Sequence, residues 1–462
     1  MTRVRKFVWG AFAVGTLALP RIASAAEFSL GGYYRLRMLA FESLSGGVGL
    51  EGVPDDRSTG YWQHRVRFDP KVKLNDNVSF FMQIDLLDNT VAGDLPEKGA
   101  SYQEEDIPEF FSQGALGQND ENGDSRRNIV VKRAWGEVLT GIGQLKFGRM
   151  GSHWGLGILA NDGNGWDDDT GDTVDRVMFI TKAGPIYIVP MIDKISEGPI
   201  WSSSTPGEPA DVERNRNTLH KSTDDVDQIT LVAVYRGELS SAGVYGVYRY
   251  QPSTEGSAMI GDVWAKTRIG PVAVEAEGVY LSGDIINFSG LGSPTRVKAT
   301  QWGAALETEI PLKLVTPGLD LGAASGDDKS GKTLNNFTFD RNYRIALLLF
   351  RYVGVLDGPK ALTNVSYVRP NVKWEVFDNF TLDAAVVYAQ TMTKSSTNQE
   401  GAYGTEVDIG ATWRLYEDFE AGLRYGALAP GDALRQPSGF PTSQGKLDSV
   451  IHGFEGRFLI RF

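Results

Sequence analysis

Residues 60–74 alternate between two kinds of side chain. The even positions from Trp62 to Leu74 are mostly apolar, whereas the odd positions from Gln63 to Lys73 are polar or charged. A period of two is typical of a β-strand whose two faces meet different surroundings. Charge in the middle of a strand is costly against lipid, so the polar face is predicted to line water.

The last residues, 453–462, repeat this pattern. Phe454 and the terminal Phe462 fall on the apolar face, and Glu455 and Arg457 fall on the opposite face. A strand that ends on an exposed aromatic ring would be a poor edge for a soluble sheet. It is well suited to close a barrel with lipid outside and water inside. This stretch alone leaves an ordinary strand of a soluble sheet open as the alternative.

Similar segments follow one another along the whole chain, joined alternately by tight turns and by long polar loops. This alternation predicts an all-β fold, a transmembrane antiparallel up-and-down β-barrel with short periplasmic turns and long extracellular loops. We expect about 18 strands, in a range of about 16–18. The expected strands are residues 27–41, 60–74, 78–88, 128–140, 144–150, 173–182, 186–193, 226–238, 242–251, 258–269, 272–283, 296–310, 314–324, two that flank 377–379, two that flank 416–418, and 453–462.

Residues 341–352 could form a further strand, but two observations argue against it. The run 346–350 is continuously apolar and does not alternate. An additional wall strand would also make the count odd, whereas single-chain bacterial barrels have even numbers. Residues 326–360 are therefore interpreted as an extracellular excursion that folds against the pore mouth.

The first residues, 1–25, have the order of a secretory signal peptide. A basic start at 3–6 precedes an apolar run at 7–19 and small residues at 23 and 25. The apolar run is short for a membrane helix, although a retained anchor helix is the alternative. We expect residues 26–462 to form one barrel domain in the outer membrane of a Gram-negative bacterium.

Composition limits the chemistry of the chain. Cysteine is absent, which excludes disulfides and thiolate metal sites. The formal net charge is -12, which argues against nucleic acid as a partner. Glycine is abundant, with 54 residues, and aromatic residues make up 11%, which suits turns and interfacial girdles.

Strand alternation places a set of charged side chains on the lumen face, basic on the early strands and more acidic on the later ones. They are Arg35, Arg37, Arg65, Arg67, Lys71, Lys73, Lys266, Arg268, Glu275, Glu277, Glu307, Asp408, Arg424 and Arg457. Opposed charges across a water-filled lumen would set a transverse field that selects polar solutes. The alternative is that these charges pair and plug the barrel.

No motif points to catalysis or to a cofactor. The acidic segments 166–172 and 325–328 resemble calcium loops only loosely, and we interpret them as solvated loops. The histidines do not have metal-ligand spacing, and no Gly-x-Ser-x-Gly elbow or phosphate-binding loop is present. The chain is therefore not expected to be an enzyme, and no metal or cofactor is expected.

Two groups of barrels share short motifs with this chain. The first is carried by residues 147–150, Trp154-Gly155, Trp166 and 175–177, and is similar to the "FGR…G…D" region of alginate-export and related porin-like barrels. Residues 323–328, 339–340 and 343–350 resemble both that group and a second one, a little-studied family of predicted outer-membrane barrels. The match to this second family is extended by Asn364, 367–370, 406–408 and 429–432. The first resemblance implies an 18-strand barrel with an arginine-rich lumen that passes an anionic polysaccharide. The second implies fold and location only.

These observations favour a porin-like channel for passive passage of hydrophilic solutes through a charged lumen. The alternative is a non-conducting outer-membrane barrel that acts as a surface-binding or assembly scaffold. A pore would leave the lumen charges solvated, whereas a plugged scaffold would pair nearly all of them. The expected partners are outer-membrane lipid and lipopolysaccharide, small hydrophilic solutes, and the barrel-assembly machinery, because the strand ending in Phe462 resembles its C-terminal recognition signal.

Overall fold

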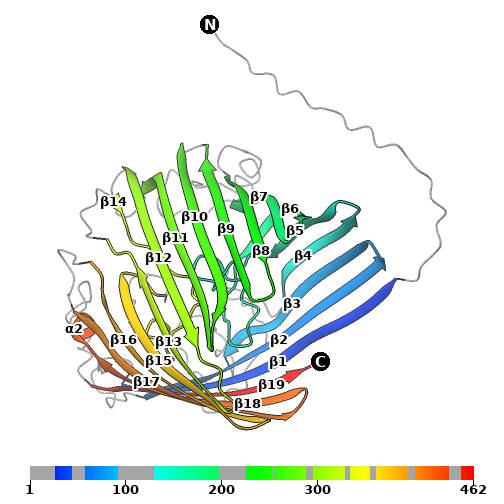
Figure 1. Cartoon of the computed structure of the whole chain (residues 1–462). Helices are drawn as coiled ribbons and strands as arrows, with labels where there is room; N and C mark the ends of the chain where they lie inside the picture. Colours follow the sequence, from blue (N-terminus) through cyan, green and yellow to red (C-terminus); the bar gives the residue numbers. More distant parts are fainter. Residues whose placement is uncertain are drawn as a thin grey trace, which may run out of the picture.

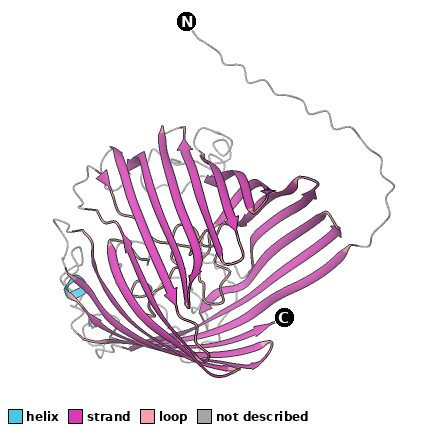
Figure 2. Ribbon diagram, in the orientation of Figure 1, coloured by secondary structure: helices cyan, strands magenta, loops and turns pink. Residues whose placement is uncertain are grey.

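The computed structural model describes residues 26–43, 58–91, 129–196, 225–252, 255–287, 295–327, 333–353, 361–393, 401–435 and 449–462. The expected signal peptide, 1–25, lies outside this part of the chain and stays a prediction. In the described part nearly all regular structure is β-strand, with one short helix, α2 (Asp432–Arg435) (Figure 2). None of the described helices is long and apolar enough to cross a membrane.

The strands form one sheet that closes on itself (Figure 1). Their bounds are β1 (Glu27–Glu42), β2 (Ser58–Asn75), β3 (Val78–Val91), β4 (Ile129–Thr140), β5 (Gly143–Gly151), β6 (Thr173–Ala183), β7 (Ile186–Ser196), β8 (Val226–Arg236), β9 (Ser240–Gln251), β10 (Gly256–Ile269), β11 (Val272–Asn287), β12 (Thr295–Glu309), β13 (Val315–Ala324), β14 (Thr333–Leu334), β15 (Val365–Phe377), β16 (Phe380–Thr391), β17 (Ala402–Tyr416), β18 (Phe419–Pro430) and β19 (Ile451–Arg461).

The ends of the chain meet at a seam between β1 and β19, drawn blue and red in Figure 1. Tyr33 pairs with Arg461 and Glu42 pairs with His452, in antiparallel register. The terminal residue continues the ladder, because Gly32 and Phe462 exchange two backbone hydrogen bonds of 2.9 and 3.1 Å. The ring of Phe462 also lies 5.5 Å from that of Phe68 on β2. The closing role predicted for the last strand is confirmed.

The two-residue strand β14 does not belong to the wall. β13 pairs directly with β15, and β14 only adds to the side of β12 in parallel. The segment between β13 and β15 therefore leaves the sheet and returns to it. The described wall consists of 18 antiparallel strands, as the even-number argument predicted.

Side-chain exposure follows the alternation of each strand. Trp62, Val177 and Phe454 are exposed on the outer face, whereas Arg35 and Arg65 are buried. An apolar exterior around charged inward-facing groups is the arrangement of a barrel that stands in lipid. Every expected wall strand has an observed counterpart, and the largest difference in bounds is at β11, which continues past its expected end at 283 to Asn287.

Short turns join strands at one end of the barrel. In the β2–β3 turn, the side chain of Asn75 accepts hydrogen bonds from the backbone N–H groups of Asn77 and Val78 at 2.9 and 3.0 Å. Gly184 and Gly270 occupy the β6–β7 and β10–β11 turns with φ of 60° each, a left-handed conformation that favours glycine. Local sequence therefore specifies these reversals.

Candidate functional site

Two segments between wall strands fold into the barrel (Figure 2). We call residues 152–172, which follow β5, the acidic inner loop. We call residues 335–353, which precede β15, the apolar inner loop. The sequence pattern predicted the second segment at the pore mouth and the acidic part of the first in solvent. Both predictions are wrong, because the two segments lie inside the barrel.

The contacts of the acidic inner loop show that it lies inside. The indole N–H of Trp154 donates to Asp262 of β10 at 2.9 Å. The guanidinium of Arg457 on β19 donates to the carboxylate of Asp167 at 2.5 Å. A loop outside the ring could not reach strands on such separate parts of the wall. Side chains that contact this loop therefore point inward.

Two aspartates of this loop are surrounded by arginines. The carboxylate of Asp169 forms ion pairs with Arg37 and with Arg344, the latter at 2.8 Å. The carboxylate of Asp167 pairs with Arg457. Segment 166–172 is thus not a solvated loop, because its carboxylates neutralise guanidinium groups that the wall directs into the lumen.

Backbone carbonyls of the same loop complete the arginine contacts. Arg35 donates to the carbonyl of Trp166 at 2.8 Å, and Arg65 donates to that of Asp168 at 2.6 Å. Arg65 also donates to the carboxylate of Asp88 at 2.7 Å. Hydrogen bonds to charged donors are stronger than neutral ones, so these contacts fix the loop firmly.

The electrostatic state of Asp169 follows from these neighbours. Burial alone would raise the pKa of its carboxyl group. The guanidinium groups of Arg37 and Arg344 outweigh burial, and the pKa falls below its ordinary value. Asp169 is therefore ionised at neutral pH.

Further along the wall, buried arginines pair with buried aspartates of neighbouring strands. Arg67 of β2 and Asp85 of β3 form a two-pronged pair with distances of 2.7 and 2.8 Å. Arg176 of β6 and Asp193 of β7 do the same at 2.6 and 2.8 Å. A lone charge at such a site would be costly, and the two-pronged pairing offsets part of that cost.

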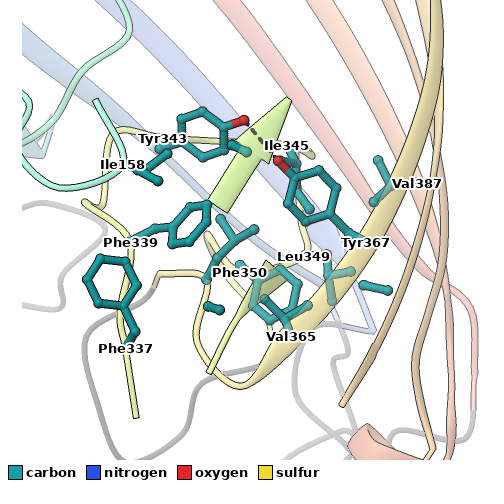
Figure 3. Close-up of a cluster of buried hydrophobic side chains, with 14 of the residues drawn as sticks. Ile158, Phe337, Phe339, Tyr343, Ile345, Leu349, Phe350, Val365, Tyr367 and Val387 are labelled. Carbon is teal, nitrogen blue, oxygen red and sulfur yellow. Dashed lines mark hydrogen bonds between the residues drawn. The ribbon is translucent and has the colours of Figure 1, made fainter. Parts of the chain in front are cut away.

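The apolar inner loop supplies a core inside the barrel (Figure 3). Phe339, Leu349 and Phe350 pack there among wall residues such as Val365. One aromatic residue of the loop, Tyr343, is also hydrogen-bonded to an aromatic residue of the wall, Tyr367. The continuous apolar run that did not fit a wall strand is explained by this position, because residues 347–350 are all buried.

Tyr343 joins the apolar inner loop to two wall strands. Its hydroxyl lies 2.8 Å from that of Tyr367 on β15, the dashed line in Figure 3. It also donates to Glu307 of β12 at 3.0 Å. The two inner loops meet nearby, where the N–H of Asp340 donates to the carbonyl of Ile158 at 2.9 Å.

Wall carboxylates hold the backbone of both inner loops. Glu277 of β11 accepts from the N–H groups of Gly157 and Ile158 at 3.0 and 3.4 Å. It therefore caps a bend of the acidic inner loop. Strand alternation predicted Glu277 as a solvated charge of the lumen, but the side chain is buried and anchors the loop.

Two carboxylates of β17 hold the backbone of the apolar inner loop in the same way. Glu406 of β17 accepts from the N–H groups of Leu348 and Leu349, both at 2.7 Å. Asp408 accepts from that of Leu347 at 3.2 Å. Three successive backbone donors inside the barrel thus find acceptors on one wall strand, as buried N–H groups require.

The remaining predicted lumen residues are spread over the wall. Lys73 pairs with Asp76 beside the β2–β3 turn at 2.8 Å, and Lys71 lies 5.2 Å from the ring of Phe81. Lys266 pairs with Glu275 at 2.7 Å. Arg424 lies 3.7 Å from Asp167, and Arg268 is exposed. The predicted set is thus not gathered into one site.

Several members of the arginine network were missed by sequence analysis. Arg133 and Arg176 could have been found, because they fall on the polar face of expected strands. Arg344 and Arg351 could not, because they lie in a segment without alternation. Asp169 gave no signal that separates a buried acidic loop from a solvated one.

In the described part of the chain, no group of three or more His, Cys, Asp or Glu side chains is arranged to hold a metal ion. In the second acidic segment, 325–328, Ser325 donates to the carbonyl of Asn335 at 2.6 Å, and Asp327 accepts from the N–H of Asn335 at 3.2 Å. These residues fix the start of the apolar inner loop. Residue 328 lies outside the described residues.

Comparison with known proteins identifies the fold. No protein-family model matches the chain, and no curated protein matches it. A BenF-like porin from Pseudomonas fluorescens Pf-5 superposes with a TM-score of 0.55 at 8% identity, covering 94% of this chain and 98% of that one. The chain has a porin-like fold.

Two further porin-like matches are OccK1 (OpdK) and OccK8 (OprE) of Pseudomonas aeruginosa. Both superpose with a TM-score of 0.52, and both matches cover 94% of this chain and 98% of the other chain. The sequence identity is 9% for OccK1 and 8% for OccK8. Identities this low establish the fold alone. The expected kinship with the alginate-export group and with the family of predicted barrels is not shown.

Proposed function

We propose that this porin-like barrel is an outer-membrane channel of a Gram-negative bacterium, through which small hydrophilic solutes diffuse past the two inner loops. The observation that carries the proposal is that charged groups remain accessible inside a closed barrel whose outer face is apolar. Arg424 on β18 is 47% exposed although it points toward the inner loops, and Arg369 on β15 is 30% exposed. Charged groups accessible inside a barrel imply that water reaches them.

The orientation and partners follow from the same proposal. Short turns would face the periplasm and long loops the exterior, with the apolar outer face in contact with lipid and lipopolysaccharide. The seam strand that ends at Phe462 would be the segment recognised by the barrel-assembly machinery. Transport, and not catalysis, is the proposed role.

The anionic polysaccharide implied by the alginate-export resemblance is not part of the proposal. Arg37, Arg65 and Arg67 are neutralised by carboxylates of the chain itself. A wall whose guanidinium groups are already paired offers little attraction to a polyanion. A small solute that threads between the inner loops fits the described interior better.

A specific observation also favours the scaffold as second candidate. Most of the predicted lumen charges are paired, as expected for a barrel that does not conduct. Planar-bilayer recording of the purified protein separates the two. We expect discrete openings from the intact protein, and larger ones after residues 336–351 are replaced by a short Gly-Ser linker. If the intact protein carries no current and the shortened variant conducts, the plugged scaffold is established.

Folding must be checked in parallel. Both proteins should show the shift in gel mobility on heating that is expected of a closed barrel. Silence from two correctly folded proteins would overturn the channel proposal altogether.

A further inference from the structure

A recess of about 110 Å³ lies between the apolar inner loop and the wall formed by β15 to β18. Its charged lining residues are Arg344, Arg351, Arg369, Asp383, Asp408 and Arg424. Since a water molecule takes up about 30 Å³ in the liquid, this space admits a head group of a few non-hydrogen atoms. It contains basic and acidic groups together, which is unusual for a site that binds a simple anion.

Strand register places two of these charges on either side of a glycine. Asp383 of β16 pairs with Gly410 of β17, and Gly410 pairs with Arg424 of β18. Neighbouring strands lie about 4.8 Å apart, so the two charged residues are about 10 Å apart at their Cα atoms. Gly410 has no side chain, and the carboxylate of Asp383 lies over it, 2.4 Å from where a Cβ atom would stand.

Most other charges of the recess are already engaged. Arg369 pairs with Asp320 at 2.5 Å, and Arg351 pairs with Glu455 at 2.8 Å. Asp383 differs, because among the described residues it makes no hydrogen bond or ion pair that the structure records. Arg424 has only the 3.7 Å contact with Asp167. Asp408 accepts the 3.2 Å hydrogen bond from Leu347 through one oxygen, and its Oδ1 has no partner. The groups left available are thus the guanidinium of Arg424, the carboxylate of Asp383 and one oxygen of Asp408.

The inner wall of the recess offers a further donor. Arg351 is more than nine-tenths buried, and its Nε and Nη2 atoms have no hydrogen-bond acceptor, since the carboxylate of Asp169 is 3.7 Å from Nη2. Buried donors without acceptors are costly, and an acceptor on a bound molecule would remove the cost. This donor belongs to the apolar inner loop, which lines the recess together with the wall strands.

We propose that the recess binds the head group of a zwitterionic solute, such as an α-amino acid, on its way through the channel. The carboxylate lies against Arg424 and the free donors of Arg351, and the ammonium lies against Asp383. A simple anion would leave Asp383 uncompensated, and a simple cation would do the same to Arg424. The inference rests on the proposed channel function and names its class of solute.

Three solutes that share one carbon skeleton test this assignment: alanine, lactate and alaninamide. They present a zwitterion, an anion and a cation, respectively. In single-channel recordings at low salt, alanine is expected to interrupt the current of the intact protein at concentrations at least tenfold below the other two. Equal effects of all three would overturn the zwitterion assignment while leaving the channel intact.

Variants locate the effect. Asp383→Asn and Arg424→Gln should each remove the preference for alanine over the matched single-charge solute. Gly410→Ala should weaken the effect of alanine on the current although every charge is retained. The reason is that the added Cβ would come within 2.4 Å of the Asp383 carboxylate and displace it. Arg268→Gln, at an exposed arginine outside the recess, is the matched control and should behave as the intact protein.

A binding measurement keeps the inference testable without conduction. Calorimetric titration of the detergent-solubilised protein with alanine should give saturable binding that Asp383→Asn reduces at least tenfold and Arg268→Gln does not. Absence of current with binding present would overturn the channel but support the recess. Absence of alanine binding in folded protein would overturn the recess.

Discussion

Arg65 and Arg67 show at the residue scale how far a pattern reaches. Alternation correctly placed both on the inner side of β2, and it predicted that they stand in water. The structure instead leaves them 1% and 4% exposed, in contact with Asp88 and Asp85. Periodicity fixes the direction of a side chain but carries no information about what it meets.

A charge-reversal experiment follows from this difference. Arg65→Glu with Arg67→Glu would place two further carboxylates beside Asp85 and Asp88. Breaking a buried pair costs about 3–5 kcal/mol, so the double variant should unfold at markedly lower denaturant concentration. Arg268→Glu, at an exposed position, should be nearly neutral. Equal unfolding midpoints for the double variant and the intact barrel would show that these arginines are solvated after all.

Asp340 is the residue from which a pH dependence is expected. Burial, with Asp172 and Asp168 nearby, raises the pKa of its carboxyl group to about 7. Between about pH 4 and pH 7 the folded protein therefore holds a proton that the unfolded chain has lost, so this group's contribution to stability declines as pH rises through that window.

The matching variant is Asp340→Asn, which keeps the shape and cannot ionise. Its melting temperature should fall less than that of the intact protein as the pH is raised from 4 to 8. Melting curves in detergent at a series of pH values provide the measurement. Parallel curves for the two proteins would mean that Asp340 titrates in its ordinary range.

At the scale of elements, the wall could be predicted and the interior could not. Each wall strand has unlike surroundings on its two faces, which imposes a period of two that survives in the sequence. The inner loops have no such constraint. The apolar run 346–350 indicated burial but not the place in the fold where it is buried. The acidic residues 167–169 have the same sequence pattern whether they face solvent or a ring of arginines.

The anchoring of the apolar inner loop by Glu406 yields a prediction at this scale. Glu406→Ala removes the acceptors of two backbone N–H groups, at Leu348 and Leu349. Leaving buried donors unpaired costs about 1–3 kcal/mol each, so the loop should detach more often. Protease cleavage within 341–353 is expected to accelerate severalfold, while the barrel keeps its heat-dependent gel shift.

Glu406→Gln is the control for this experiment, because its amide oxygen retains one acceptor. It should be cleaved at a rate between those of the intact protein and Glu406→Ala. Identical cleavage of all three proteins would show that the carboxylate does not hold the loop.

At the scale of the whole molecule, the seam depends on the last residue. Deleting Phe462 removes two backbone hydrogen bonds to Gly32 and the ring contact with Phe68. We expect a lower yield of barrel in the outer membrane and more unassembled protein in the periplasm. Phe462→Ala keeps the backbone bonds and separates their effect from that of the ring. Unchanged yield of the heat-modifiable form after deletion would contradict the closing role.

The acidic inner loop also touches both sides of that seam. Trp166 packs edge-on against Tyr33 of β1, at 5.2 Å between ring centroids, and Asp167 pairs with Arg457 of β19. The loop therefore bridges the joint between the first and last strands on its inner side. A barrel with the loop withdrawn would keep the same ladder of backbone hydrogen bonds but would lose the ring partner of Tyr33 and one of the two carboxylates of Arg457. The joint is thus held in two directions, along the wall and across the lumen.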